Sequence, residues 1–133
     1  MDGRQWPAVE QRFATIPITS ALRLRLDELH DGVAVLTAPH DPAYDGIFRS
    51  FHGGLLMTLA DTAACIAILT RAGAEAEVTT TDMNIRFLAP CRSDVTARAE
   101  LIKLGRTLCP VAVQLHDAAG VLVALAQVTY MRL

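Results

Sequence analysis

Apolar and charged residues alternate near the start of the chain. Residues 23–29 (RLRLDEL) show this pattern, which predicts a strand with one buried face. His30-Asp31-Gly32 follows, and its glycine is suited to a tight turn. Residues 32–38 (GVAVLTA) then predict the second strand of a hairpin.

One stretch, from His52 to Arg71, is apolar on nearly all of its helical faces. Its length and composition predict one long helix, and Gly73 is a suitable residue to end it. A helix without a broad polar face has to be covered on several sides. We therefore expect other elements to wrap around it.

Strand patterns dominate the second half of the chain. Residues 78–89 (VTTTDMNIRFLA) alternate in a way that predicts Met83, Ile85 and Phe87 on the core face. Pro110 cannot donate a ladder hydrogen bond, so its strand is expected at a sheet edge or with a bulge. The other predicted elements are a short helix over residues 8–14, a loop over 39–51, and strands over 94–104, 107–116 and 121–132.

The order of these elements predicts the fold class. Two strands, one buried helix and then four strands indicate an α+β domain, an antiparallel β-sheet wrapped around one long central helix. Residues 1–133 are expected to form this single domain. A sheet of this size covers one side of the helix, so we expect a second chain to cover the other.

Composition excludes several classes of function. The chain has 133 residues, of which 52% are hydrophobic, so it can build a core and is not a disordered protein. Its net charge of −2 argues against nucleic-acid binding, for which a strongly basic face is typical. The four histidines show no metal-ligand spacing, so no metal is predicted.

The cysteines, the N-terminal segment and the longest apolar run predict where in the cell the protein lies. Cys65, Cys91 and Cys109 have no CxxC spacing and cannot all pair, which is typical of reduced thiols in a cytoplasmic protein. The polar N-terminus, MDGRQWPAVEQRF, shows no signal peptide. The apolar run over residues 55–70 contains Asp61 and is shorter than the roughly 20 apolar residues of a membrane span, so no membrane is expected.

The segment HGGLLMTLAD (residues 52–61) combines a glycine-rich helix start with a lone carboxylate. Gly53 and Asp61 are eight residues apart, which is about 12 Å along a helix. The two residues can therefore not contact one small reacting group within a single chain. If both serve one site, Asp61 must come from a second copy, as in a two-fold dimer with antiparallel helices.

Each residue of this segment offers a distinct chemistry. The helix N-terminus at Gly53 presents free N–H groups that can polarise a carbonyl. Asp61 can attack a carbonyl directly or deprotonate a water. His52 can donate a hydrogen bond to a substrate or leaving group. Structural explanations stand beside these functions: close packing for the glycines, an ion pair or cap for Asp61, and a structural hydrogen bond for His52.

Four segments carry a resemblance to a known family. HGGLLMTLAD, VTTTDMNIRFLAP, LIKLGRT and GVLVALAQVTYMRL resemble the PaaI-like group of hotdog-fold acyl-CoA thioesterases, from about residue 40 to the C-terminus. The resemblance implies a hotdog fold, homodimers assembled as homotetramers, and hydrolysis of acyl-CoA thioesters at the dimer interface.

The resemblance also assigns roles to individual residues. Gly53 matches the residue whose N–H polarises the thioester carbonyl, Asp61 of the partner chain matches the nucleophile or general base, and His52 matches a histidine near the thioester. Thr80 matches a position that holds the attacking water, and Thr79 or Thr81 could take its place. Coenzyme A is then part of the substrate, and no separate cofactor is implied.

A coenzyme A groove is implied by the same resemblance. Arg92, Lys103 and Arg106 are the expected phosphate partners, and cations near turns suit a small anionic ligand better than a polymer. The residues that match the groove are Gly54, Phe87, Leu88, Pro90, Arg92, Lys103, Gly105, Arg106 and Thr107.

The sequence departs from the family pattern at one position. Family members usually carry an asparagine six residues before the histidine, where this chain has Gly46 beside Asp45. An ionised acid is a poor hydrogen-bond donor, so Asp45 is not an equivalent replacement.

The favoured function is hydrolysis of an aromatic or medium-chain acyl-CoA, with an acyl pocket formed by Leu56, Met57, Leu59 and Met83. The alternative is a non-catalytic protein that binds acyl-CoA or a lipid-like ligand, which the glycine at position 46 favours and the carboxylate at position 61 opposes. A hydratase or dehydratase of the same fold and a purely structural dimer are the remaining hypotheses.

Overall fold

The computed structural model describes residues 6–133, so the part of the signal-peptide prediction that falls on residues 1–5 lies outside the described residues. The elements are the helices α1 (Trp6–Thr15), α2 (Pro17–Ala21) and α3 (Gly53–Ala72), the short 3₁₀ helix η1 (Pro42–Tyr44), and the strands β1 (Arg25–His30), β2 (Val33–Ala38), β3 (Val78–Phe87), β4 (Val95–Leu101), β5 (Leu108–Asp117) and β6 (Leu122–Arg132).

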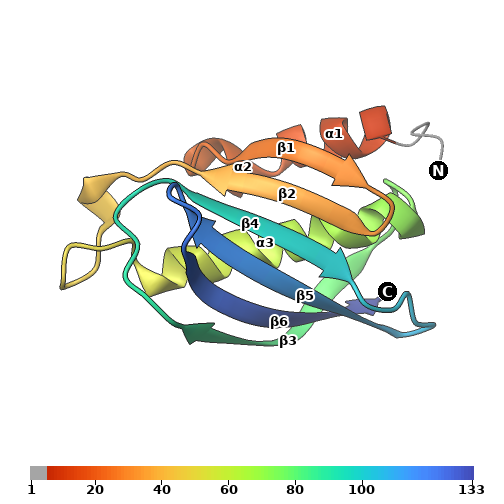
Figure 1. The fold of residues 1–133 in the computed structure, drawn as a ribbon. Coiled ribbons are helices and arrows are strands. Elements are labelled where there is room, and N and C mark those ends of the chain that lie inside the picture. Colours follow the sequence, from red (N-terminus) through yellow and green to blue (C-terminus); the bar gives the residue numbers. More distant parts are fainter. Residues whose placement is uncertain (1–5) are drawn as a thin grey trace.

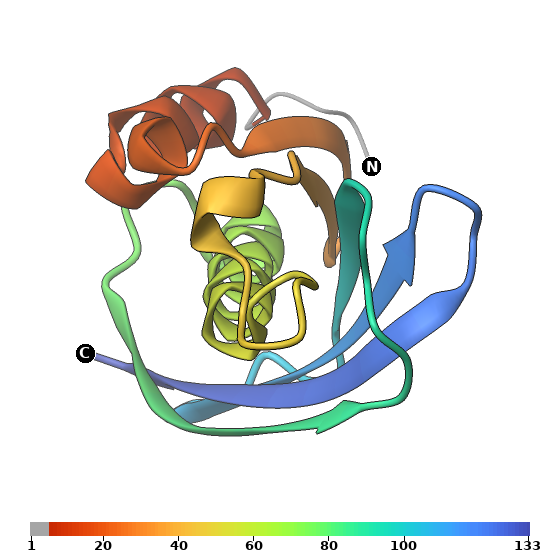
Figure 2. The same ribbon diagram turned by 90° about the vertical axis from the view of Figure 1, so that its left-hand side faces the viewer.

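The strands form one six-stranded antiparallel sheet around the central helix. Their order is β1-β2-β4-β5-β6-β3, so β1 and β3 are the edge strands (Figure 1). Figure 2 looks along α3 and shows the sheet curling around it. Helices α1 and α2 lie beside β1, at the edge of the sheet that the β1–β2 hairpin forms. This arrangement confirms the predicted antiparallel sheet wrapped around one long helix.

Helix α3 is the core of the domain. His52 is its N-cap, and Gly73 follows it with a φ of 103°, a conformation that favours glycine. With 20 residues the helix is long and apolar enough to cross a membrane by length and composition alone, which corrects the length argument from the sequence. However, 61% of its most apolar window is buried inside the protein, as is usual for a core helix.

A bulge in strand β3 changes which of its residues face the helix. The pairing with β6 shifts between Thr80 and Asp82, which leaves Thr81 as the extra residue. Residues on both sides of the bulge can therefore face the helix although their numbers differ in parity. Met83 and Ile85 pack against the core as predicted. The prediction for Phe87 was wrong, because its side chain is 51% exposed at the end of the strand.

One local prediction made from a proline was wrong. Pro110 lies in β5, an interior strand that pairs with both β4 and β6. The register is regular at this proline, and the shift in the β5–β6 pairing lies further along, between Leu115 and His116. The proline is tolerated because the β4 ladder ends at the neighbouring Leu101–Val111 pair, and its carbonyl accepts a hydrogen bond from Ile102. Pro17 lies in the first turn of α2, a position that suits a proline.

Candidate active site at the start of the central helix

The start of α3 leaves one backbone donor free. The Gly54 N–H donates to Nδ1 of His52 at 2.9 Å. The N–H groups of Leu55 and Leu56 donate to the His52 carbonyl at 2.9 and 3.1 Å. The Gly53 N–H is therefore the donor of the first helical turn that has no partner among the described residues. This donor lies at the positive end of the helix dipole.

His52 is held in one tautomer by its own capping bond. Because Nδ1 accepts the hydrogen bond from Gly54, a neutral His52 ring carries its proton on Nε2. The side chain is exposed, so its Nε2–H is available to a ligand at the helix start. The structure thus assigns Gly54 a structural bond to His52, rather than a free donor for the ligand.

An open cavity of about 360 Å³ lies beside Gly53. This volume is within the range of small-molecule sites. The Phe87 ring borders it closely: a side-chain carbon added at Gly53 would lie 3.1 Å from Cζ of Phe87. The cavity brings Gly53 together with the predicted Phe87, Leu88 and Pro90, and its full lining is Ser50, Phe51, Gly53, Leu56, Phe87, Leu88, Ala89, Pro90 and Cys91.

Asp61 projects from the middle of α3 toward strands β3 and β6. The Thr80 hydroxyl donates to its Oδ1 at 2.7 Å. The Tyr130 hydroxyl donates to the same Oδ1 at 2.9 Å and to the Asp61 main-chain oxygen at 2.9 Å. Among the three threonines left open by the sequence, Thr80 is the one that bonds to Asp61. Among residues 6–133, the carboxylate is thus held by two hydroxyl groups and by no cation.

The surroundings of Asp61 keep its neighbours uncharged. Burial, followed by the charge of Asp61, raises the pKa of the Cys65 thiol to about 11, and a hydrogen bond with Tyr130 partly opposes this shift. Burial, followed by the charge of Cys65, raises the pKa of the Tyr130 hydroxyl. Tyr130 therefore remains a neutral hydrogen-bond donor at physiological pH.

The two halves of the predicted site lie apart within one chain. Gly53 is the first residue of α3 and Asp61 the ninth, which corresponds to about 12 Å along the axis. No side chain of α3 bridges this distance. The free donor and the carboxylate could therefore act on one reacting group only if they came from different copies of the chain.

The three residues predicted to bind the phosphates of coenzyme A also lie far apart within one chain. Arg92 follows β3 at the end of the sheet where α3 begins, whereas Lys103 and Arg106 lie in the β4–β5 loop at the other end (Figure 1). Strand β4 lies between them and spans about 23 Å. All three side chains are exposed. In the loop, Gly105 has no room for a side chain, since an added carbon would lie 2.2 Å from the Leu108 carbonyl oxygen.

Asp45 does not take the place of the missing asparagine. Its Oδ1 bonds to Nε2 of His40 at 2.7 Å, and both side chains are largely buried. Gly46 lies beside His52, with ordinary van der Waals space for a side chain there. The position next to His52 thus holds no polar side chain in this protein.

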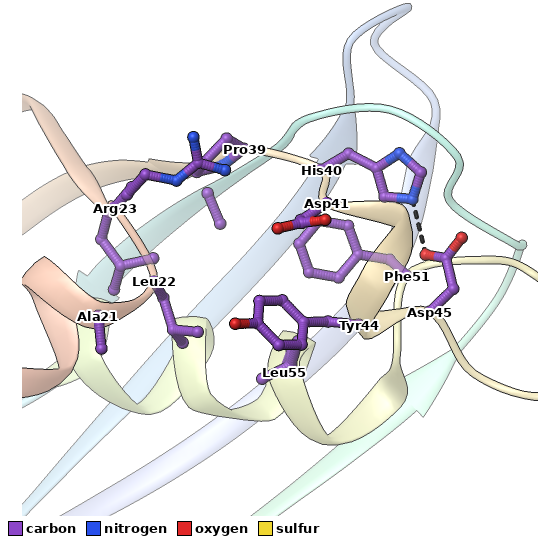
Figure 3. A pocket seen from close by; sticks show the side chains of 12 residues that line it. Ala21, Leu22, Arg23, Pro39, His40, Asp41, Tyr44, Asp45, Phe51 and Leu55 are labelled. Atoms are coloured by element: carbon purple, nitrogen blue, oxygen red, sulfur yellow. Dashed lines mark hydrogen bonds and ion pairs between the residues drawn. The ribbon is translucent and has the colours of Figure 1, made fainter.

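The His40–Asp45 pair lines a second, more enclosed cavity of about 110 Å³ (Figure 3). The His40 ring also packs against Phe51, with ring centroids 5.7 Å apart. Phe51 lines both cavities, and Leu55 of the first turn of α3 also lines the second.

The predicted acyl-pocket residues fall into two groups. Leu56 and Leu59 are buried in the core, although Leu56 also reaches the wall of the open cavity. Met57 and Met83 are partly exposed, and neither lines that cavity. The apolar wall beside Gly53 is formed instead by Phe51, Leu56 and the segment after β3.

Sequence reasoning missed Tyr130 and His40. Tyr130 lies within an alternating strand pattern, which indicates only a core residue. The signal that could have identified it is its hydroxyl, because a buried tyrosine hydroxyl usually requires a hydrogen-bond partner. His40 lies in a predicted loop, and only the fold brings it to Asp45. Within residues 6–133, no group of three or more His, Cys, Asp or Glu side chains is arranged to hold a metal ion.

The sequence matches a known protein superfamily. The sequence profile of the thioesterase superfamily matches residues 48–124, more than half of the chain. The chain belongs to the thioesterase superfamily, and its fold is the hotdog fold of that superfamily.

Individual relatives agree with this assignment. A thioesterase family protein from Silicibacter pomeroyi is 29% identical, covers 97% of this chain and 98% of its own, and superposes with a TM-score of 0.89. A mutant of the phenylacetic acid degradation protein PaaI from Thermus thermophilus is 29% identical, with 89% of this chain and 100% of that chain covered and a TM-score of 0.80. Human acyl-coenzyme A thioesterase 13 is 37% identical over 79 residues, which is 56% of this chain and 55%, about half, of the human protein.

Proposed function

We propose that this protein hydrolyses acyl-CoA thioesters with an aromatic or medium-chain acyl group, at a site shared between two copies of the chain. The observation that carries the proposal is the Asp61 carboxylate, which two hydroxyl groups hold in place, with no neutralising cation in the part of the chain that the structure describes. Membership of the thioesterase superfamily supports the reaction class.

The reaction follows from the two halves of the site. The thioester carbonyl oxygen accepts a hydrogen bond from the Gly53 N–H, and the helix dipole stabilises the charge that develops on this oxygen. Asp61 of the partner subunit either attacks the carbonyl carbon or removes a proton from a water that attacks it. In both routes the C–S bond breaks, coenzyme A leaves as its thiol after gaining a proton, and water supplies the second oxygen of the acid product. The exposed Nε2–H of His52 would donate a hydrogen bond to the thioester.

The edge strand β3 supports the shared site. An edge strand presents unpaired backbone groups to another chain. If two β3 strands pair antiparallel about a two-fold axis between Met83 and Asn84, Thr80 faces Phe87 of the partner subunit. Thr80 bonds to Asp61, and Phe87 borders Gly53. This pairing would bring the carboxylate of one chain to the helix start of the other.

Exposed apolar side chains near the helix start give a second argument for a dimer. Ile47 and Phe48 are 90% and 79% exposed at the tip of the turn before α3, and Leu88 beyond β3 is about half exposed. Large exposed apolar side chains that lie near one another often mark an interface. The same two-fold axis would also bring Arg92 of one chain toward the β4–β5 loop of the other, as a common coenzyme A phosphate site requires.

A second candidate function is binding of acyl-CoA without efficient hydrolysis. Position 46 favours it, because the glycine leaves no polar side chain beside His52 and Asp45 is occupied by His40. The two functions differ in turnover and not in binding.

The test is release of free thiol from phenylacetyl-, benzoyl-, acetyl-, octanoyl- and palmitoyl-CoA. We expect release from the aromatic or medium-chain substrates to exceed release from acetyl-CoA, because the open cavity has an apolar wall. Light scattering on the same sample should give the mass of a dimer or a larger assembly. Binding of coenzyme A without release from any thioester would favour the second candidate function.

A further inference from the structure

Tyr130 and Thr80 occupy equivalent places on neighbouring strands. They are directly paired in the β3–β6 ladder, and both hydroxyl groups reach Oδ1 of Asp61. Without the bulge at Thr81, Thr80 would point away from the helix when Met83 points toward it. The bulge therefore allows both strands to contribute a donor to one carboxylate oxygen.

The two hydroxyl groups differ in how firmly they are held. Tyr130 is 6% exposed, and its ring packs in the hydrophobic core. Its hydroxyl is shared between Oδ1 and the main-chain oxygen of Asp61, so it fixes the side chain relative to the helix backbone. Thr80 is exposed on the edge strand and provides the second donor.

We propose that Tyr130 is a positioning residue that fixes the Asp61 carboxylate through Oδ1 and thereby presents Oδ2 as the reacting oxygen. Both donors engage Oδ1, and the structure shows no hydrogen bond to Oδ2 among the described residues. Rotation of the carboxylate out of this orientation would break both bonds. This inference rests on the proposed thioesterase function and specifies which atom of Asp61 performs it.

The test is Tyr130→Phe, which removes the hydroxyl and keeps the buried ring. We expect kcat to fall about 10- to 100-fold, because a misplaced catalytic group costs rate steeply, while KM stays within about twofold. The matched control is Thr129→Val, which removes a hydroxyl from the adjacent residue on the outer side of β6 and should leave kcat unchanged.

The split between kcat and KM, measured on variant protein whose circular dichroism spectrum matches that of the wild type, separates positioning from a general loss of structure.

The outcomes are distinguishable. An active wild type together with a Tyr130→Phe variant of unchanged kcat would overturn the positioning role alone. A loss confined to KM, or a loss matched by Thr129→Val, would also overturn it. A wild type that releases no thiol from any acyl-CoA would overturn the proposed function, and the positioning role with it.

Discussion

Asp61→Asn should lower kcat for thioester hydrolysis about 10²- to 10⁴-fold, the range in which a general acid or base contributes to an enzyme. The amide is neutral, so it can neither attack the carbonyl nor remove a proton from water. It has almost the same shape as the carboxylate, and its oxygen can still accept the bonds from Thr80 and Tyr130. Steady-state kinetics with the best acyl-CoA would measure the loss.

A matched control for this variant is Asp31, in the β1–β2 turn beside the C-terminal end of α3. Asp31 forms a surface ion pair with Arg71 at 3.0 Å, and such exposed pairs contribute little to stability. Asp31→Asn makes the same chemical change away from the site and should keep wild-type kcat. Wild-type turnover in Asp61→Asn, with the dimer intact by light scattering, would show that this carboxylate has no catalytic role.

The second large effect is expected for Gly53→Val. An added side-chain carbon would lie 3.1 Å from the Phe87 ring, and the two further methyl groups would cover the approach to the backbone N–H. The variant should approach the roughly 10²- to 10³-fold loss in kcat that follows removal of an oxyanion donor. The loss would be measured as kcat and KM together, since blocked access also weakens substrate binding.

Ala72→Val provides the control for added bulk on the same helix. It places a valine at the last residue of α3, 19 positions from the first, where no part of the proposed site lies. Its kcat should equal that of the wild type. Equal losses in both variants would mean that Gly53→Val acts by disturbing the helix and not by blocking the donor.

Much of the fold could be predicted because its pattern is local. The alternation in residues 23–29 and the unbroken apolar character of residues 52–71 appear in the structure as β1 and α3 within a few residues. The edge position or bulge expected at Pro110 was wrong because the local sequence does not reveal where the neighbouring strand ends. The ladder between β4 and β5 stops beside this proline, so an interior position costs little.

The site was predictable only in part because it is assembled from distant segments. Gly53 and Asp61 were identified from one short segment of the central helix, where spacing can be converted into distance. The contact between Tyr130 and Asp61 joins residues 69 positions apart and depends on the curl of the sheet around the helix. The bond between His40 and Asp45 depends on the path of a loop, which the sequence predicts only as irregular.

The central claim is that one catalytic site uses two copies of the chain, and mixed dimers test it most directly. Asp61→Asn and Gly53→Val chains with different affinity tags would be coexpressed, and the heterodimer would be purified through both tags. In a shared site the heterodimer carries one intact site, with Gly53 from one chain and Asp61 from the other, so it should recover about half of the wild-type kcat per dimer. A heterodimer no more active than the two inactive homodimers would contradict the shared site.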